Sequence, residues 1–286
     1  MRDLTALVIV PAALLVLIGC TESGSIEPGG GAASPTAVTV RGGVEVAGTG
    51  STASTTGGEV ELIGDPGSIS GTILFDGTAP KLAPVVAQGT AKADPAVCAK
   101  NGNIPDESLV VSTGGGIANV FVYLSKAPKG FEFDKPAEQP FLDQKACIFQ
   151  PHALLLWSGL DFELKNSDKV PHNVQTFPAR NSGENNNLSP GSSMKTSFRN
   201  AEPAPFPSKC AIHPWMQYWT LVVDHPFAAV TDADGKFEIP NIPPGKYKFR
   251  VFHERGEMLE RGVEVVVKPE TETSVEWKYG ASSFGL

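Results

Sequence analysis

Histidine, cysteine and methionine are scarce in this chain of 286 residues, which has five, four and four of them. Residues 67–286 show no long amphipathic helical pattern, so no helical domain is expected there. Basic residues form no patch that would indicate a nucleic-acid partner, and 31 acidic residues against 23 basic ones leave a net charge of −8. Turn formers are abundant instead, with 30 glycines and 24 prolines. This composition favours an all-β fold.

An apolar stretch runs from Leu4 to Ile18 at the N-terminus. It is shorter than the roughly 20 residues that a membrane-spanning helix needs, and small residues follow it, as in a secretory signal. Leu17-Ile-Gly-Cys20 resembles a bacterial lipobox, which implies that Cys20 carries a lipid. We therefore expect a signal peptide at residues 1–19; simple cleavage with an incidental cysteine is the alternative. Both place the mature protein outside the cytoplasm, in the periplasm or cell envelope.

Residues 20–66 are rich in Gly, Ser, Thr, Ala and Pro and have few aromatic residues. Such a segment buries too little apolar surface to order itself, so it is predicted to be a disordered tether behind the lipid. Its valines at positions 38–46 are compatible with one short strand. The tether would connect the lipid anchor to a folded part that begins near residue 67.

Alternating apolar residues predict strands throughout the remaining chain. Ile69, Ile73 and Phe75 alternate with more polar neighbours, and Asp76-Gly77 ends the run. Further strands are predicted near residues 120–124, 237–239, 246–251, 263–267 and 275–279, with a hairpin turn at 233–235.

Four potential metal ligands stand in two segments of this β-rich part. Cys210-Ala-Ile-His213-Pro-Trp-Met216 allows one tight loop to turn a thiolate, an imidazole and a thioether onto a single ion. His172, about forty residues upstream, can supply a second imidazole from another strand. This is the ligand set of a mononuclear type 1 (blue) copper site, with methionine as the weak axial ligand. Soft sulfur selects copper over magnesium or calcium, and the thioether makes zinc the weaker candidate.

The number of cysteines supports the same conclusion. Once Cys20 is set aside, Cys98, Cys147 and Cys210 remain, an odd number for a compartment that permits disulfides. If Cys210 binds the metal, Cys98 and Cys147 are left as a plausible disulfide. Two free buried cysteines are the alternative.

Residues 147–224 resemble the cupredoxin family, through alternating apolar positions in Phe149–Leu164, a turn at Asn166-Ser-Asp and the two ligand segments. The short ligand loop is most similar to that of the amicyanin-type cupredoxins of methylamine utilisation. The resemblance implies one type 1 copper held by His172, Cys210 and His213, with Met216 axial. It also implies that Asn173 braces the loop that carries the thiolate.

In that family the loop histidine is the electron port, with its ring edge exposed within an apolar patch. The resemblance therefore implies an exposed edge on His213, surrounded by Pro171, Pro214 and Trp215. Redox partner proteins would dock there through a small interface.

Two further segments resemble the carboxypeptidase-regulatory-like (transthyretin-like) β-sandwich. They are Gly-x-Ile-x-Gly-x-Ile-x-x-Asp-Gly at residues 67–77 and Thr-Asp-Ala-Asp-Gly-Lys-Phe-x-Ile-Pro-x-Ile-Pro-Pro-Gly-Lys-Tyr at 231–247. We therefore expect a cupredoxin-like domain at residues 147–227, inserted in or packed against a sandwich whose two parts are residues 67–146 and 228–286.

Three functions are compatible with these features. The first is an extracytoplasmic electron carrier, lipid-anchored to a membrane and not an enzyme. A copper enzyme is the second, although the His-x-His pairs typical of such oxidases are absent from the chain. A non-redox envelope module for copper storage, copper delivery or adhesion is the third. His152, His225 and His253 could converge on a second metal, but ordinary structural roles are favoured.

Overall fold

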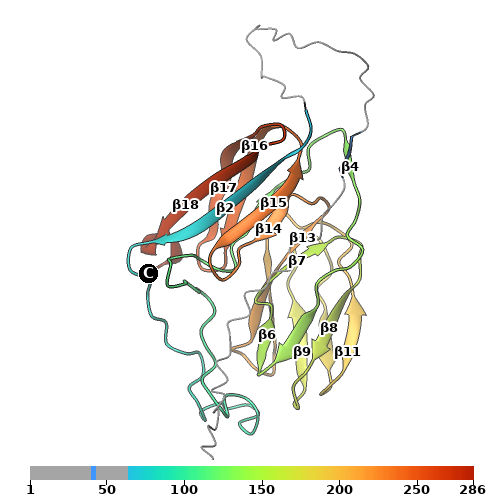
Figure 1. Ribbon diagram of the computed structural model, residues 1–286. Coiled ribbons are helices and arrows are strands. Elements are labelled where there is room, and N and C mark those ends of the chain that lie inside the picture. The colour runs from blue at the N-terminus through green and yellow to red at the C-terminus, as the bar shows by residue number, and fades with distance from the viewer. Residues whose placement is uncertain (1–39, 43–63) are drawn as a thin grey trace, which may run out of the picture.

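The computed structural model describes residues 40–42 and 64–286 (Figure 1). This part of the chain is almost entirely strand and connecting loop, so the all-β prediction is confirmed. The predicted signal peptide, Cys20 and most of the tether lie outside the described residues. In the described part, no helix has the length and apolar character needed to cross a bilayer.

The strands form two sandwiches, and the larger one has nine strands. Its sheets have the orders β10-β9-β12-β13-β7 and β11-β8-β5-β6, and two of its pairs, β13 with β7 and β5 with β8, are parallel. The strands of this nine-strand sandwich are β5 (Leu142–Lys145), β6 (Ile148–Gln150), β7 (Ala153–Trp157), β8 (Phe162–Asn166), β9 (His172–Thr176), β10 (Asn185–Leu188), β11 (Ser193–Thr196), β12 (Phe206–Lys209) and β13 (Gln217–Val223).

The seven-strand sandwich is built from the chain before and after this unit. Its sheets have the orders β14-β3-β16-β17 and β15-β2-β18. Its elements are β2 (Gly67–Asp76), β3 (Phe121–Leu124), β14 (Ala228–Val230), β15 (Lys236–Ile242), β16 (Gly245–His253), β17 (Glu257–Val267), β18 (Glu272–Gly280) and the 3₁₀ turn η1 (Ala281–Phe284). The nine-strand sandwich is thus an insertion between β3 and β14.

The insertion begins earlier in the chain than the expected position 147. Strand β5 lies before that position, yet it pairs with β6 and β8 of the nine-strand sandwich. Leu142 is fully buried in the core of that sandwich, which fixes β5 there. A short pair, β1 (Val40–Gly42) with β4 (Phe131–Phe133), precedes it, and β1 falls in the region where one short strand was expected.

The two sandwiches share an apolar interface because the strands that meet there bury both faces. In β13, Tyr218 and Val222 point into the nine-strand core, whereas Leu221 and Val223 point toward the other sandwich. Strand β3 contributes Phe121 and Tyr123 to the same interface. Since side chains alternate between the faces of a strand, these strands are apolar at successive positions rather than at every second one.

Residues 82–108 form an irregular segment that we call the cap. It leaves the seven-strand sandwich after β2 and runs along one end of the nine-strand sandwich (Figure 1). Its apolar residues Val86, Ala91 and Ile104 join the nine-strand core. A disulfide between Cys98 and Cys147, the pair favoured by the cysteine count, ties the cap to the turn between β5 and β6.

One segment differs from expectation. Asn181–Asn187 reads as a polar turn region, but Asn185–Leu188 forms the edge strand β10, paired with β9. An edge strand is paired on one side only and can therefore be polar, which is why apolar alternation does not reveal it.

Candidate metal centre

Sheet register brings the predicted ligands to one end of the nine-strand sandwich. Strand β9 begins at His172, and β12 pairs antiparallel with β9 so that Lys209 lies opposite Gln175. Cys210 follows directly after β12, at the end of the sheet where β9 starts. The loop of residues 210–216 then closes before β13 begins at Gln217.

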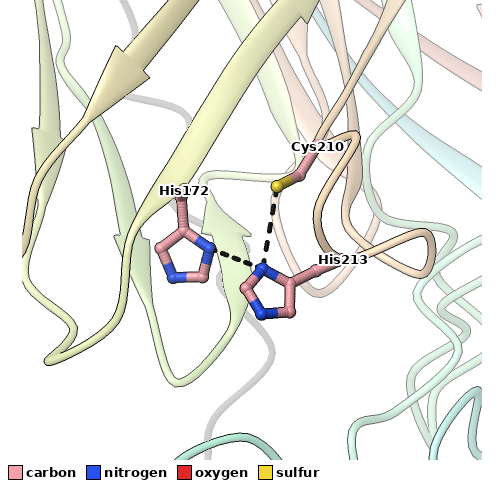
Figure 2. Close-up of side chains that lie close together, drawn as sticks. All are labelled: His172, Cys210 and His213. Carbon is pink, nitrogen blue, oxygen red and sulfur yellow. Dashed lines mark hydrogen bonds between the residues drawn. The ribbon is translucent and has the colours of Figure 1, made fainter. Parts of the chain in front are cut away.

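His172, Cys210 and His213 point toward one another, as Figure 2 shows. The Nδ1 atoms of the two imidazoles are 2.9 Å apart, and the Cys210 sulfur lies 3.7 Å from His213 Nδ1. The ligand atoms of all three residues fall within 4.8 Å of one another. The three residues are buried, with exposed fractions of 0–2%. Two imidazole nitrogens and one sulfur therefore converge on one small, buried space.

The loop is closed by its own backbone. The Cys210 N–H donates to the carbonyl of Met216 at 3.1 Å, and the Met216 N–H donates to the carbonyl of His213 at 2.9 Å. Met216 is 1% exposed and belongs to the nine-strand core. The residue predicted as axial ligand is thus buried at the closing end of the ligand loop.

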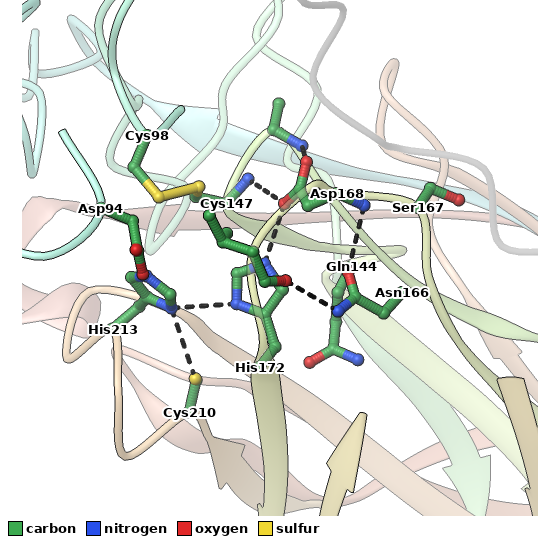
Figure 3. Close-up of polar contacts among 12 residues, drawn as sticks. Asp94, Cys98, Gln144, Cys147, Asn166, Ser167, Asp168, His172, Cys210 and His213 are labelled. Atoms are coloured by element: carbon green, nitrogen blue, oxygen red, sulfur yellow. Dashed lines mark hydrogen bonds and ion pairs between the residues drawn. A yellow bond between two sulfur atoms is a disulfide. The ribbon is translucent and has the colours of Figure 1, made fainter. Parts of the chain in front are cut away.

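Each imidazole is held from behind by a carboxylate (Figure 3). His172 Nε2 is 2.9 Å from Asp168 Oδ2, and His213 Nε2 is 3.0 Å from Asp94 Oδ2. Such partners fix the ring orientation and the tautomer, so that the other ring nitrogen faces the metal. Here both Nδ1 atoms face the shared space. Neither Asp94 nor Asp168 was predicted in this role. Asp94 lies 119 residues from His213, and Asp168, four residues before His172, was interpreted only as part of a turn.

Asp168 also shapes the turn that carries the disulfide. Ala146 and Cys147 have φ values of 57° and 58°, the left-handed pair typical of a two-residue hairpin, although neither is glycine. Asp168 accepts the N–H groups of Ala146 at 2.7 Å and Cys147 at 2.8 Å. One carboxylate thus stabilises the β5–β6 turn and orients His172.

Asn173 contacts the ligand loop, as the resemblance implied. Its Oδ1 accepts the N–H of Ala211 at 2.8 Å and lies 3.3 Å from the Cys210 sulfur. Its side-chain amide donates to Oδ1 of Asn185 at 2.6 Å, on the edge strand β10. Asn185 is a supporting residue that no motif in the sequence indicates.

The cluster favours a thiolate at neutral pH. Burial opposes the charge, but hydrogen bonds with His172 and His213 outweigh it and lower the pKa of the Cys210 thiol to about 5. Burial likewise opposes a charged imidazole, yet Asp168 and Cys210 raise the pKa of His172 to about 9. A metal ion that binds here replaces that proton, since only the neutral imidazole is a ligand.

The expectation of an exposed port on His213 is wrong. His213 is 0% exposed because Asp94 of the cap covers its Nε2 edge. Trp215 is only partly exposed; its ring lies 5.2 Å from the His213 ring, and its Nε1 donates to the Cys147 carbonyl. Pro171 and Pro214 of the expected apolar patch are exposed, and so is Ile212, which was not expected there. A partner could touch these residues but not the imidazole itself.

The other histidines do not join a metal-sized group within residues 64–286. His225 Nδ1 accepts the N–H of Phe227, and His253 packs edge-on against Phe284. His152 lies between two carboxylates described below. A second grouping of Cys147, Asp168 and His172 is not a metal site, because the sulfur of Cys147 is in the disulfide.

Comparisons with known proteins return cupredoxins among solved structures. Similar chains include a copper-containing nitrite reductase from Thermus scotoductus SA-01 (17% identity, TM-score 0.28, 35% of this chain and 25% of the reductase), a reduced amicyanin variant (16%, 0.27, 32% and 87%) and a purple cupredoxin from Nitrosopumilus maritimus (24%, 0.24, 27% and 84%). No family model and no curated protein matches the chain. The chain spans only a quarter of the nitrite reductase.

Proposed function

We propose that this chain is an electron-transfer protein that carries one type 1 copper. His172, Cys210 and His213 would bind the ion, with Met216 as its axial ligand. The observation that carries the proposal is the buried convergence of two Nδ1 atoms and one sulfur within 4.8 Å. Two imidazoles and one thiolate with a nearby thioether favour copper over zinc and exclude the hard cations.

The residues around the centre suit one-electron exchange. Copper bound there would take up and release a single electron. Asp168 and Asp94 hold the two imidazoles, and Asn173 holds the loop at Ala211, so the ligands have little freedom to rearrange. Hydrogen bonding near the Cys210 sulfur and the buried surroundings would set the potential.

Copper storage or delivery is the second candidate, and the burial of His213 is the observation that favours it. A covered imidazole edge slows electron exchange with a large partner, whereas it does not hinder a protein that merely holds the ion. Reversible voltammetry of the copper form, set against copper loss to a chelator, separates the two. Fast electron exchange with slow copper loss supports the carrier.

We infer an extracytoplasmic protein, lipid-anchored at Cys20, which exchanges electrons with partner proteins and does not bind nucleic acid. The Cys98–Cys147 disulfide supports an oxidising compartment. The net charge of −8 is compatible with a basic partner surface.

Cu(II) loading tests the proposal directly. The protein should turn intensely blue, with a narrow copper hyperfine splitting in its electron paramagnetic resonance spectrum, and Cys210→Ser should lose the colour completely. Met216→Leu should keep copper but shift its potential upward, whereas Met258→Leu at the sandwich interface should leave the potential unchanged. A blue Cys210→Ser protein would refute the assignment.

A further inference from the structure

A cavity of about 230 Å³ lies where the cap, the ligand loop and the seven-strand sandwich meet. Its apolar walls include Val85, Ile104, Phe149 and Trp215. An enclosed apolar cavity of about 150 Å³ holds benzene, so the volume of this more polar space is sufficient for one substituted aromatic ring.

The polar end of the cavity is built around His152, which is 6% exposed. Its Nε2 is 2.5 Å from Oε1 of Glu254, whose other oxygen accepts Trp219 Nε1 at 2.9 Å and Gln217 Nε2 at 3.2 Å. Glu254 is therefore fully engaged. His152 Nδ1 is different: it is buried, has no hydrogen-bond partner and stands 3.7 Å from Oε2 of Glu107.

His152 is protonated at neutral pH. Burial opposes its charge, but Glu254 and Glu107 outweigh burial and raise the pKa of the imidazole to about 10. Both ring nitrogens then carry hydrogen, and the Nδ1–H is a donor that stands too far from the Glu107 carboxylate for a direct hydrogen bond. A group that completes this arrangement must accept from His152 and donate to Glu107.

A hydroxyl group meets both requirements. An ammonium ion cannot accept a hydrogen bond, and an ionised carboxylate cannot donate one. Asp106, Glu107 and Glu254 in the lining also repel anions. The aromatic walls favour a flat ring at the other end. We propose that this cavity binds a small neutral phenol, with its hydroxyl beside the His152–Glu107 pair and its ring against Trp215.

Binding at this cavity needs no metal, so it is separable from the proposed copper centre. The test uses the copper-free full chain at pH 7, titrated by calorimetry with phenol, anisole and benzene. Anisole can accept from His152 but cannot donate to Glu107. Phenol should bind at least ten-fold more tightly than anisole. Equal affinities of phenol and benzene, or no binding of phenol because the space holds water only, would overturn the proposal.

Two variants locate the ligand. Glu107→Leu removes the acceptor and should lower phenol affinity about ten-fold, to the level of anisole, whereas Glu276→Leu, at an exposed position of β18 outside the cavity lining, should not change it. Val85 is 45% exposed on the cavity wall, so Val85→Trp should block phenol and benzene alike while the fold is kept. Unchanged phenol binding in both cavity variants would place the ligand elsewhere.

Discussion

The two buried histidine clusters of this protein are made from similar parts but arranged in opposite ways. At the metal centre, Asp168 and Asp94 hold the outer Nε2 atoms of His172 and His213, so the inner nitrogens converge on Cys210. In the second cluster, Glu254 and Glu107 flank both nitrogens of a single imidazole, His152, and leave no lone pair to share. An imidazole beside a carboxylate does not by itself make a metal site. A metal can bind only where the second ring nitrogen points into a space that it shares with other ligand atoms.

The cap contributes to both clusters. Asp94 reaches His213 and Glu107 reaches His152, and the disulfide at Cys98 lies between these two residues in the chain. The cap therefore links the cluster around His172 and His213 to the cluster around His152. Variants that act on one cluster, on the other, or on the cap that joins them test how far the two clusters depend on each other.

Exchange of one histidine in each cluster should have the largest effect. His172→Gln removes an equatorial ligand and should abolish the blue colour of the copper-loaded protein. His152→Gln should keep the colour at full intensity, because its imidazole does not face the metal. Absorption and paramagnetic resonance spectra of the two variants, compared at equal copper content, measure this. A colourless His152→Gln protein would show that the clusters are not separate.

Removal of the disulfide should weaken both clusters together. The bridge closes a loop between residues 49 positions apart, and chain-entropy arguments give such a loop about 4 kcal/mol of stability. The double variant Cys98→Ala/Cys147→Ala should lose about that much free energy of unfolding in urea. Hydrogen exchange should rise in residues 82–108 first. Unchanged exchange in the cap would mean that apolar contacts alone hold it in place.

The dependence of stability on pH isolates the second cluster. His152 has a folded pKa of about 10 against 6.5 in the unfolded chain, so the folded state binds an extra proton between these values. This stabilisation is complete below pH 6.5 and is lost as the pH rises through 10. Between about pH 7.5 and 9 the free energy of unfolding should fall by about 1.4 kcal/mol per pH unit more steeply than in His152→Gln. Parallel slopes would mean that the imidazole is neutral in the fold.

The convergence of His172, Cys210 and His213 could be predicted because most of the motif is local. Cys210, His213 and Met216 share one loop, and His172 begins a strand with a readable apolar pattern. The groups that hold the ligands could not be predicted. Asp94 comes from an irregular segment 119 residues away from His213, and nothing in its neighbourhood indicates that contact.

The insertion of one sandwich into another was readable from two separated halves of one pattern, but its boundary was not. Strand β5 has only four residues, of which Leu142 and Gln144 are buried, too short a run for alternation to show. The burial of His213 could not be predicted for the same reason. A local motif predicts which atoms bind, whereas the exposure of His213 depends on a distant segment that covers it.

The smallest effect is expected from Asp94→Asn, which tests the cap contact at the metal centre. Asparagine keeps an oxygen that can accept the His213 Nε2–H, so the ring orientation should survive, but the negative charge is lost. Removal of such a partner typically lowers metal affinity 10- to 100-fold. Because asparagine retains the hydrogen bond, the loss of affinity in this variant should be about 10-fold. Copper affinity, measured by competition with a chelator, should fall by that factor. Asp106→Asn, in the same segment but bonded to the Ser108 N–H, is the matched control and should bind copper as the parent does. If both variants lose copper affinity equally, the cap supports the site through its overall conformation rather than through the Asp94 carboxylate.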